Sequence, residues 1–308
     1  SILIFFTGLF GILQRNSDSM TPALLGLSLS YSLIITGTVN WSIRQYAETE
    51  NAMNSVERLK NYAYDLPQEK YRGTEEPPES WPSSGKIIIK ELFLKYAPEL
   101  PDVIHGISLE IKDGEKIGIV GRTGSGKSTL SQSFFRLIEP SSGTVLIDGV
   151  DIRNLNLERL RKALAVIPQE PFLITGTLRE NIDPCDQYSD LDIWNAIERA
   201  SLKEKYSSSG DGLESKIEFS GDNLSVGQKQ LTCLARALLK KPKILVMDEA
   251  TANVDSATDE WIQKSLRNDF EGVTVLTIAH RLNTIMDYDR ILVLNNGRIS
   301  EYASPAEL

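Results

Sequence analysis

Paired cysteines are missing from this sequence of 308 residues, and positive charge is scarce. The two cysteines, Cys185 and Cys233, lie far apart and outside any CxxC spacing, so neither a disulfide framework nor a zinc site is indicated. We expect ordinary thiols in a reducing compartment. Lys and Arg number 33 against 42 Asp and Glu, which gives a net charge of -9. A nucleic-acid partner is therefore disfavoured, because binding to a phosphate backbone needs a basic surface.

Two apolar segments open the chain, at residues 1–14 and, after a short polar break, at the charge-free residues 22–41. A membrane-spanning helix needs about 20 apolar residues, so the second segment is long enough and the first resembles a truncated span. No basic segment precedes the first run, which disfavours a signal peptide. Trp41 and Arg44 fit an aromatic belt and the positive-inside bias, so we expect the later residues to be cytosolic. Two buried helices of a soluble protein are the alternative.

Beyond the apolar segments the sequence becomes polar. Residues 42–64 keep a helical pattern, which predicts a cytosolic stalk that continues the membrane helix and ends before Pro67. The stretch rich in Pro, Glu and Ser up to Gly85 predicts a linker. We therefore divide the chain into a membrane remnant (1–64), a linker (65–85) and a compact domain (86–308).

The compact domain alternates strand-like and helical patterns and shows no internal repeat. We expect antiparallel strands at 86–95 and 107–111, a helix at 155–164, a mostly helical region at about 177–239, and further strands at 145–148, 165–168, 244–248, 273–278 and 291–294. Asn296-Gly297 predicts a hairpin turn after the last of these. The pattern predicts an α/β fold with a parallel core sheet, an antiparallel β subdomain and a helical subdomain.

The clearest motif is a phosphate-binding loop of the form G-x-x-x-x-G-K-[ST], at 121–128. It lies between an apolar strand and an amphipathic helix, as the motif requires; a Gly/Ser turn followed by a chance lysine is the alternative. Backbone amides at the helix start can cradle a triphosphate, Lys127 can reach the outer phosphates, and the Ser128 hydroxyl can bind Mg²⁺. The expected contact residues are Gly121, Thr123, Gly124, Ser125, Gly126, Lys127, Ser128 and Thr129.

A second motif is the apolar strand at 244–248, which ends in the carboxylates Asp248 and Glu249. A buried parallel strand would deliver Asp248 to the edge of the sheet beside the phosphate loop, where it would hold Mg²⁺ directly or through water. Glu249 would then polarise the attacking water. The phosphate loop favours this interpretation over a solvent-facing strand end.

A third motif begins a helix. Ser225 is a good N-cap and Gly227 permits close approach of another backbone, so the helix start forms a second anion site. The ligand of this second anion site would be a nucleotide bound by another domain. The sequence Leu224-Ser225-Val226-Gly227-Gln228 is similar to the Leu-Ser-Gly-Gly-Gln signature of ATP-binding-cassette transporters.

This resemblance extends to further motifs in the order found in that family. It implies that Tyr96 stacks on adenine, that Gln169 senses the metal and the water, and that His280 contacts the γ-phosphate. The loop that would touch the partner domain comprises Ala252, Asn253, Val254 and Asp255.

Within the family, the sequence resembles the multidrug-resistance-associated (ABCC) subfamily. The resemblance rests on the phosphate loop, the signature run up to Leu231 and the membrane remnant. The resemblance implies the end of the second membrane domain followed by the second nucleotide-binding domain. In that family two such domains meet head to tail, which implies that each ATP lies between one phosphate loop and the other domain's signature. Glu249 implies a hydrolytic site in this domain. Val226 replaces the usual Gly, so we expect the partner's site to bind ATP without efficient turnover.

The resulting hypothesis is an ATPase that drives an exporter, with ATP and Mg²⁺ as ligands. The expected partners are a second nucleotide-binding domain, further membrane helices and the lipid bilayer of a plasma or vacuolar/endomembrane. An ATP-gated channel or regulatory subunit of the same subfamily is the alternative. The membrane remnant and the signature disfavour a soluble kinase or GTPase. The sequence also lacks the Asn-Lys-x-Asp element that recognises guanine.

Overall fold

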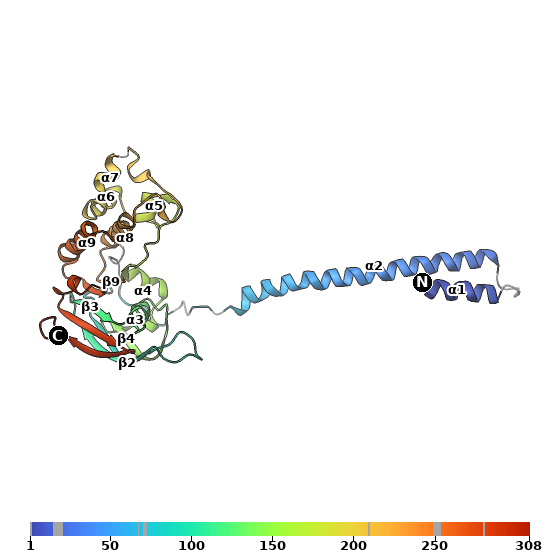
Figure 1. Ribbon diagram of the computed structural model, residues 1–308, viewed down its shortest axis with the longest axis horizontal. Coiled ribbons are helices and arrows are strands. Elements are labelled where there is room, and N and C mark those ends of the chain that lie inside the picture. Colours follow the sequence, from blue (N-terminus) through green and yellow to red (C-terminus); the bar gives the residue numbers. More distant parts are fainter. Residues whose placement is uncertain are drawn as a thin grey trace. The chain divides into compact units, whose positions relative to one another are not determined.

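The computed structural model describes residues 2–14, 21–66, 68–69, 73–208, 210–248, 254–279 and 281–308. The chain forms two compact units, Ser1–Glu69 and Lys70–Leu308, and each is described by itself (Figure 1).

The first unit consists of two helices packed side by side, α1 (Ile2–Leu13) and α2 (Pro22–Lys60), and a π-helical turn at Asn61–Asp65 (Figure 1). Thr21 is the N-cap of α2, and Pro22 occupies the first position of the helix. The Thr7 and Ser32 hydroxyls lie 2.9 Å apart, and Gly11 packs against Leu25. These pairs run in opposite directions along the two helices, so α1 and α2 are antiparallel. Small and hydroxyl residues at the contact are typical of helices that associate in lipid.

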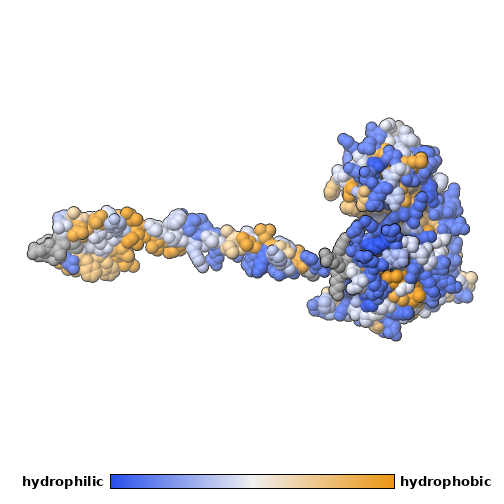
Figure 2. Space-filling view, turned by 180° about the vertical axis from the view of Figure 1, so that it is seen from behind, coloured by the Kyte–Doolittle hydropathy of each residue, from blue (hydrophilic) through white to orange (hydrophobic). Residues whose placement is uncertain are grey.

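Helix α2 is long and apolar enough to cross a membrane, whereas α1 is shorter. Its 39 residues correspond to about 58 Å, roughly twice the hydrocarbon thickness of a bilayer. Large apolar side chains such as Leu33, Ile34 and Trp41 are exposed on this unit. Figure 2 shows apolar surface on this unit. The predicted spanning segment and stalk are therefore one unbroken helix.

The second unit is built on a six-stranded sheet with the order β12-β11-β3-β10-β9-β6. All neighbours are parallel except β11 and β12, which the predicted turn at Asn296-Gly297 joins as an antiparallel hairpin. The strands are β3 (Lys116–Gly121), β6 (Leu164–Ile167), β9 (Ile244–Asp248), β10 (Thr274–Ile278), β11 (Arg290–Asn295) and β12 (Arg298–Ala303). The carboxyl ends of the parallel strands all lie at one edge.

A four-stranded antiparallel sheet with the order β2-β1-β4-β5 packs against this core. Its strands are β1 (Ile87–Leu94), β2 (Ile104–Ile111), β4 (Pro140–Ile147) and β5 (Val150–Asp151). Two strands are longer than predicted. β2 continues through Gly106 back to Ile104, and β4 includes the polar residues from Pro140 onward, because both pair with the outer half of β1.

The helical region lies at one end of the second unit (Figure 1). It contains α5 (Leu178–Ile182), α6 (Asp190–Arg199), α7 (Lys203–Ser208), α8 (Val226–Lys240), a 3-10 turn at Gly212–Glu214, and the short pair β7 (Gly176–Thr177) and β8 (Lys216–Ile217). The other helices of the unit are α3 (Lys127–Phe134), α4 (Leu157–Ala163) and α9 (Ser256–Asn268), with 3-10 turns at Ile152–Asn154, Phe219–Gly221 and Leu282–Thr284.

The core sheet is buried on both faces, which explains its nearly continuous apolar strands. In β9, Leu245 and Met247 belong to the hydrophobic cluster shared with the helical region, whereas Ile244 and Val246 belong to the cluster shared with the antiparallel sheet. The central strands are therefore held in place from both sides.

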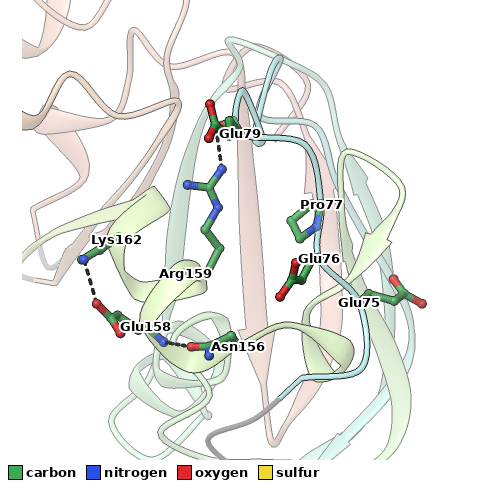
Figure 3. Close-up of a pocket in the computed structure, with 8 residues that line it drawn as sticks. All are labelled: Glu75, Glu76, Pro77, Glu79, Asn156, Glu158, Arg159 and Lys162. Carbon is green, nitrogen blue, oxygen red and sulfur yellow. Dashed lines mark hydrogen bonds and ion pairs between the residues drawn. The ribbon is translucent and has the colours of Figure 1, made fainter.

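The second half of the predicted linker is fixed to the second unit. Glu75 pairs with Leu155 in a parallel bridge, and Arg159 of α4 donates hydrogen bonds to the carbonyls of Pro78 and Glu79. We call this segment, residues 73–86, the strap. Figure 3 shows Arg159 reaching the strap across a pocket between the strap and α4. Trp81 is buried and donates to the Ile147 carbonyl at 3.0 Å. The sequence placed the domain start at 86, whereas these contacts attach residues from about 73 onward.

Asp148 holds the end of this segment. Its carboxylate accepts hydrogen bonds from the backbone amides of Ser83, Ser84, Gly85 and Lys86, at 2.7 to 3.3 Å. Burial alone would raise the pKa of Asp148, but the hydrogen bonds from the Ser84 hydroxyl and from these amides outweigh it and lower the pKa. Asp148 thus joins the strap to the β4–β5 turn.

We expect Asp148→Asn to destabilise the second unit by about 1–3 kcal/mol at pH 7, because the amide nitrogen cannot accept the bonds of the second carboxylate oxygen. A depressed folded-state pKa contributes stability above the unfolded value of 3.8, which is lost as pH falls through the folded value. The difference between wild type and variant should therefore shrink below pH 3.8. Urea unfolding of the intact chain in detergent measures both effects. Asp113→Asn, at an exposed turn, is the control, and an equal loss there would contradict the assignment.

Candidate nucleotide-binding site

The phosphate loop joins β3 to α3 and adopts a conformation that its glycines permit. Gly126, the N-cap of α3, has φ +100, and a Cβ there would lie 2.6 Å from Ile104 Cδ1. A Cβ at Gly121 would lie 2.3 Å from the Leu294 carbonyl oxygen. Side chains at these two positions would collide with β2 and β11. The loop can therefore curl only with glycine at both.

Polar groups of the loop are left for a ligand. The Ser125 side chain is buried, and its Oγ has no hydrogen-bond partner among the described residues. A buried hydroxyl without a partner is costly unless a ligand satisfies it. The Ser128 side chain is exposed at the start of α3. This donor set fits a phosphate group at the N-terminus of a helix.

Lys127 lies within the loop. Its side chain is buried, and Nζ donates to the carbonyls of Gly121 (2.9 Å) and Arg122 (3.2 Å). These bonds hold the ammonium group over the loop. A phosphate in the loop would meet a positive charge that is already in place.

Tyr96 lies just beyond the end of β1 with its ring exposed. Its hydroxyl is 3.0 Å from the Thr129 hydroxyl, in the first turn of α3. One end of the ring is thus anchored to the helix that follows the phosphate loop. A base could stack on the exposed face.

The sheet register brings the second motif to the same edge. Asp248 pairs with Ile278, and Ile278 pairs with Ile119, two residues before the loop begins at Gly121. Strand β10 lies between β3 and β9, so the ends of three neighbouring strands meet there. The structure therefore places Asp248 close to the phosphate loop.

Four of the predicted functional positions, Glu249, Ala252, Asn253 and His280, lie outside the described residues. Asp248 and Ala279 show where the chain leaves β9 and β10 towards Glu249 and His280. Their roles stay predictions.

Gln169 follows β6 at the same edge and is exposed. Two α8 residues hold its segment. Gln230 donates from Nε2 to the carbonyls of Pro168 (3.1 Å) and Gln169 (3.0 Å), and Arg236 donates to the Phe172 carbonyl at 2.7 Å. Neither Gln230 nor Arg236 is among the functional residues predicted from the sequence motifs. The sequence does carry a signal for both: they are polar residues at positions that the helical period of α8 assigns to its buried face.

The signature begins α8 with a capping box. Ser225 Oγ accepts from the Gln228 amide at 3.2 Å, and Gln228 Oε1 accepts from the Ser225 amide at 3.1 Å. Leu224 is buried and Val226 is exposed. The structure thus fixes the cap but presents the Val226 side chain on the surface.

The signature also touches the start of α9. A Cβ at Gly227 would lie 2.8 Å from Thr258 Oγ1 and 3.2 Å from Asp255 Oδ1. Asp255 caps α9 by accepting from the Thr258 amide at 3.1 Å, and Val254 beside it is buried. Gly227 is therefore the residue that allows α8 to approach the end of the predicted partner-facing loop.

The parallel sheet, the phosphate loop at a helix start, the antiparallel and helical subdomains and the capped signature together define the nucleotide-binding domain of an ATP-binding-cassette (ABC) transporter. The sequence profile of the family described as ABC transporter matches residues 104–252. The chain belongs to this family, and to its sub-family C.

Relatives of sub-family C match nearly the whole chain. Metal resistance protein YCF1 of Saccharomyces cerevisiae is 49% identical over 311 residues, covering 100% of this chain and 20% of its own length. ABC transporter C family member 3 of Dictyostelium discoideum is 50% identical (99% and 22%), and human ATP-binding cassette sub-family C member 3 is 46% identical (99% and 20%). The chain thus spans about one fifth of these proteins and corresponds to their C-terminal part.

A solved structure, that of a bacterial Atm1-family ABC exporter with ATP bound, is similar with a TM-score of 0.73 and 29% identity. The match covers 99% of this chain and 53% of that protein. It agrees with the predicted fold class, which is confirmed.

Replacing Tyr96 by Ala should weaken ATP binding by about 1–3 kcal/mol if its ring stacks on the base. Tyr96→Phe is the matched control, because it keeps the ring and loses only the hydroxyl contact to Thr129. Titration calorimetry of the intact chain with ATP measures both. If the Ala variant binds like wild type, Tyr96 has a packing role alone. If Phe loses as much as Ala, the hydroxyl matters and stacking does not.

Proposed function

We propose that the chain is the ATP-binding and ATP-hydrolysing part of an exporter, in which ATP-driven association of two nucleotide-binding domains moves organic solutes or conjugates across a membrane. The observation that carries the proposal is the strand register that brings Asp248 to the edge holding the phosphate loop. This arrangement supports phosphoryl transfer, in which positioning and electrostatic stabilisation supply most of the rate.

Each predicted site residue of this chain would have its own role at the bound ATP. The phosphate loop would hold the triphosphate, with Lys127 on its outer phosphates. Ser128, Gln169 and Asp248 would hold Mg²⁺, which usually takes one or two carboxylates together with substrate phosphates. Bound Mg²⁺ supplies neutralisation of the charge that develops on the phosphates. Glu249 would orient and deprotonate the attacking water.

Two further groups would respond to the nucleotide's state. His280 would contact the γ-phosphate from the end of β10. The signature from Leu224 to Gln228, with Val226 in place of glycine, would close on ATP held by a second domain, and the loop Ala252–Asp255 would touch that domain. The arrangement makes each ATP site a shared one.

The first unit supports an integral membrane position with a cytosolic nucleotide-binding domain. Helix α2 passes from apolar to polar composition without a break, so movement at its polar end would reach the spanning part as rigid-body motion. The membrane would be the plasma membrane or a vacuolar or other endomembrane. Since the name of the yeast relative refers to metal resistance, metal complexes belong among the cargoes to test.

Transport into inside-out vesicles that carry the full-length protein tests the proposal. We expect ATP-dependent uptake of at least one organic conjugate or metal complex, and no uptake with Glu249→Gln. ATP-dependent ion current without solute uptake would contradict export and point instead to a channel or regulatory subunit of the same sub-family.

A further inference from the structure

The signature helix receives a side chain from a neighbouring helix that the nucleotide site does not otherwise use. Lys205 of α7 donates from Nζ to Gln228 Oε1 at 2.5 Å. The same oxygen accepts the Ser225 amide at 3.1 Å. Gln228 thus belongs both to the capping box of α8 and to a contact between α7 and α8.

These two contacts fix which way the Gln228 amide faces. A lysine ammonium and a backbone N–H are both donors and never acceptors, so both require the oxygen of the side chain. The Nε2 group must then point away from Lys205 and Ser225. No hydrogen bond from Nε2 to the described residues is present, and the Gln228 side chain is partly exposed. Two N–H donors are therefore presented beside the start of α8.

The charge on Lys205 strengthens this arrangement. The Lys205 side chain is partly buried, and this burial lowers the pKa of its amino group. A charge-assisted hydrogen bond in such a position is stronger than a neutral one. Without the ammonium, only the Ser225 amide would select the Gln228 orientation.

We propose that Lys205 is a positioning residue of the signature site: it fixes Gln228 so that the amide nitrogen donates to an oxygen of a nucleotide carried by another domain. Val226 places a side chain where the family signature has glycine, so a side-chain donor from Gln228 adds to the backbone amides there. The proposal rests on the proposed function, because the ligand is the partner's ATP.

The experiment uses the full-length protein in detergent, with Glu249→Gln to prevent turnover and a fluorophore on each nucleotide-binding domain. Energy transfer between the fluorophores reports closure as ATP and Mg²⁺ are added. We expect Lys205→Met to raise the half-saturating ATP concentration about five- to tenfold, which is the size of one hydrogen bond. Lys205→Arg should stay within about twofold of the parent, because it keeps the charge and the donor.

Lys203→Met is the matched control, since Lys203 lies on the same short helix and pairs with Glu198 rather than with α8. It should leave the half-saturating concentration unchanged. Thermal unfolding of each variant shows whether it is folded. An effect of Lys205→Met no larger than that of Lys203→Met would overturn the proposal.

Gln228→Glu separates positioning from a merely structural tie. The carboxylate keeps a partner for Lys205 but has no N–H to donate, so closure should weaken at least as much as with Lys205→Met. Closure at the parent ATP concentration would show that the contact only joins α7 to α8, which overturns the inference. If the parent protein itself shows no ATP-driven closure, the proposed function fails together with this inference, a result distinct from either variant failing alone.

Discussion

Lys127→Ala is expected to lower ATP hydrolysis by the full-length protein at least about a hundredfold and to weaken ATP binding. Removing one preorganised group that stabilises developing charge costs about 10²–10³ in rate. We expect Lys127 to act as such a group, because its buried ammonium already lies over the loop, held by the carbonyls of Gly121 and Arg122. No other described lysine has these contacts with the loop.

The aliphatic stem of Lys127 is buried too, so Ala removes packing as well as charge. Lys127→Met keeps most of the stem and removes only the ammonium. We expect the Met variant to unfold near the wild-type temperature without nucleotide and to lose hydrolysis as fully as Ala. Phosphate release assays and thermal unfolding measure the two properties. Hydrolysis at the wild-type rate in either variant would show that the phosphate loop is misassigned.

Glu249→Gln should separate hydrolysis from binding. General-base catalysis contributes about 10²–10⁴ in rate, so we expect at least a hundredfold loss of hydrolysis. ATP affinity should stay within about twofold, because the amide has nearly the same shape and Asp248 still ends β9 beside the loop. Trapped ATP should then accumulate on the protein.

Glu271→Gln is the matched control for this variant. Glu271 is exposed and lies just before β10, at the opposite edge of the sheet from the phosphate loop. Its hydrolysis rate should equal that of wild type. If Glu249→Gln still hydrolyses ATP as fast as Glu271→Gln does, another group is the base and the assignment of Glu249 is wrong.

Local sequence was sufficient wherever a pattern has one structural solution. The apolar strand before Gly121 and the helix after Lys127 were predicted from the loop motif, and Asn296-Gly297 correctly predicted the hairpin between β11 and β12. Both patterns act over a few residues, through glycine conformations that other residues rarely adopt.

Strand ends were less predictable. Gly106 in β2 and the polar start of β4 have weak strand propensity, so local pattern predicts strands only at 107–111 and 145–148. Pairing with β1 overrode that propensity, as Phe93 faces both His105 and Ser142. The attachment of the strap could not be predicted from local sequence either. Its contacts with Arg159 and Asp148 join residues 60 or more positions apart.

By itself, the sequence determined which residues this protein offers and in what pattern: a phosphate-loop motif at Gly121–Ser128, the carboxylates Asp248 and Glu249, and an N-cap at Ser225. Only the tertiary structure decided how these parts meet. The insertion of β10 between β3 and β9 brought Asp248 to the edge of the sheet that holds the loop, and the fold placed Lys205 of α7 within hydrogen-bond distance of Gln228. Residue types follow from local chemistry, but their juxtaposition follows from burial of the sheet on both faces, which no short stretch of sequence encodes.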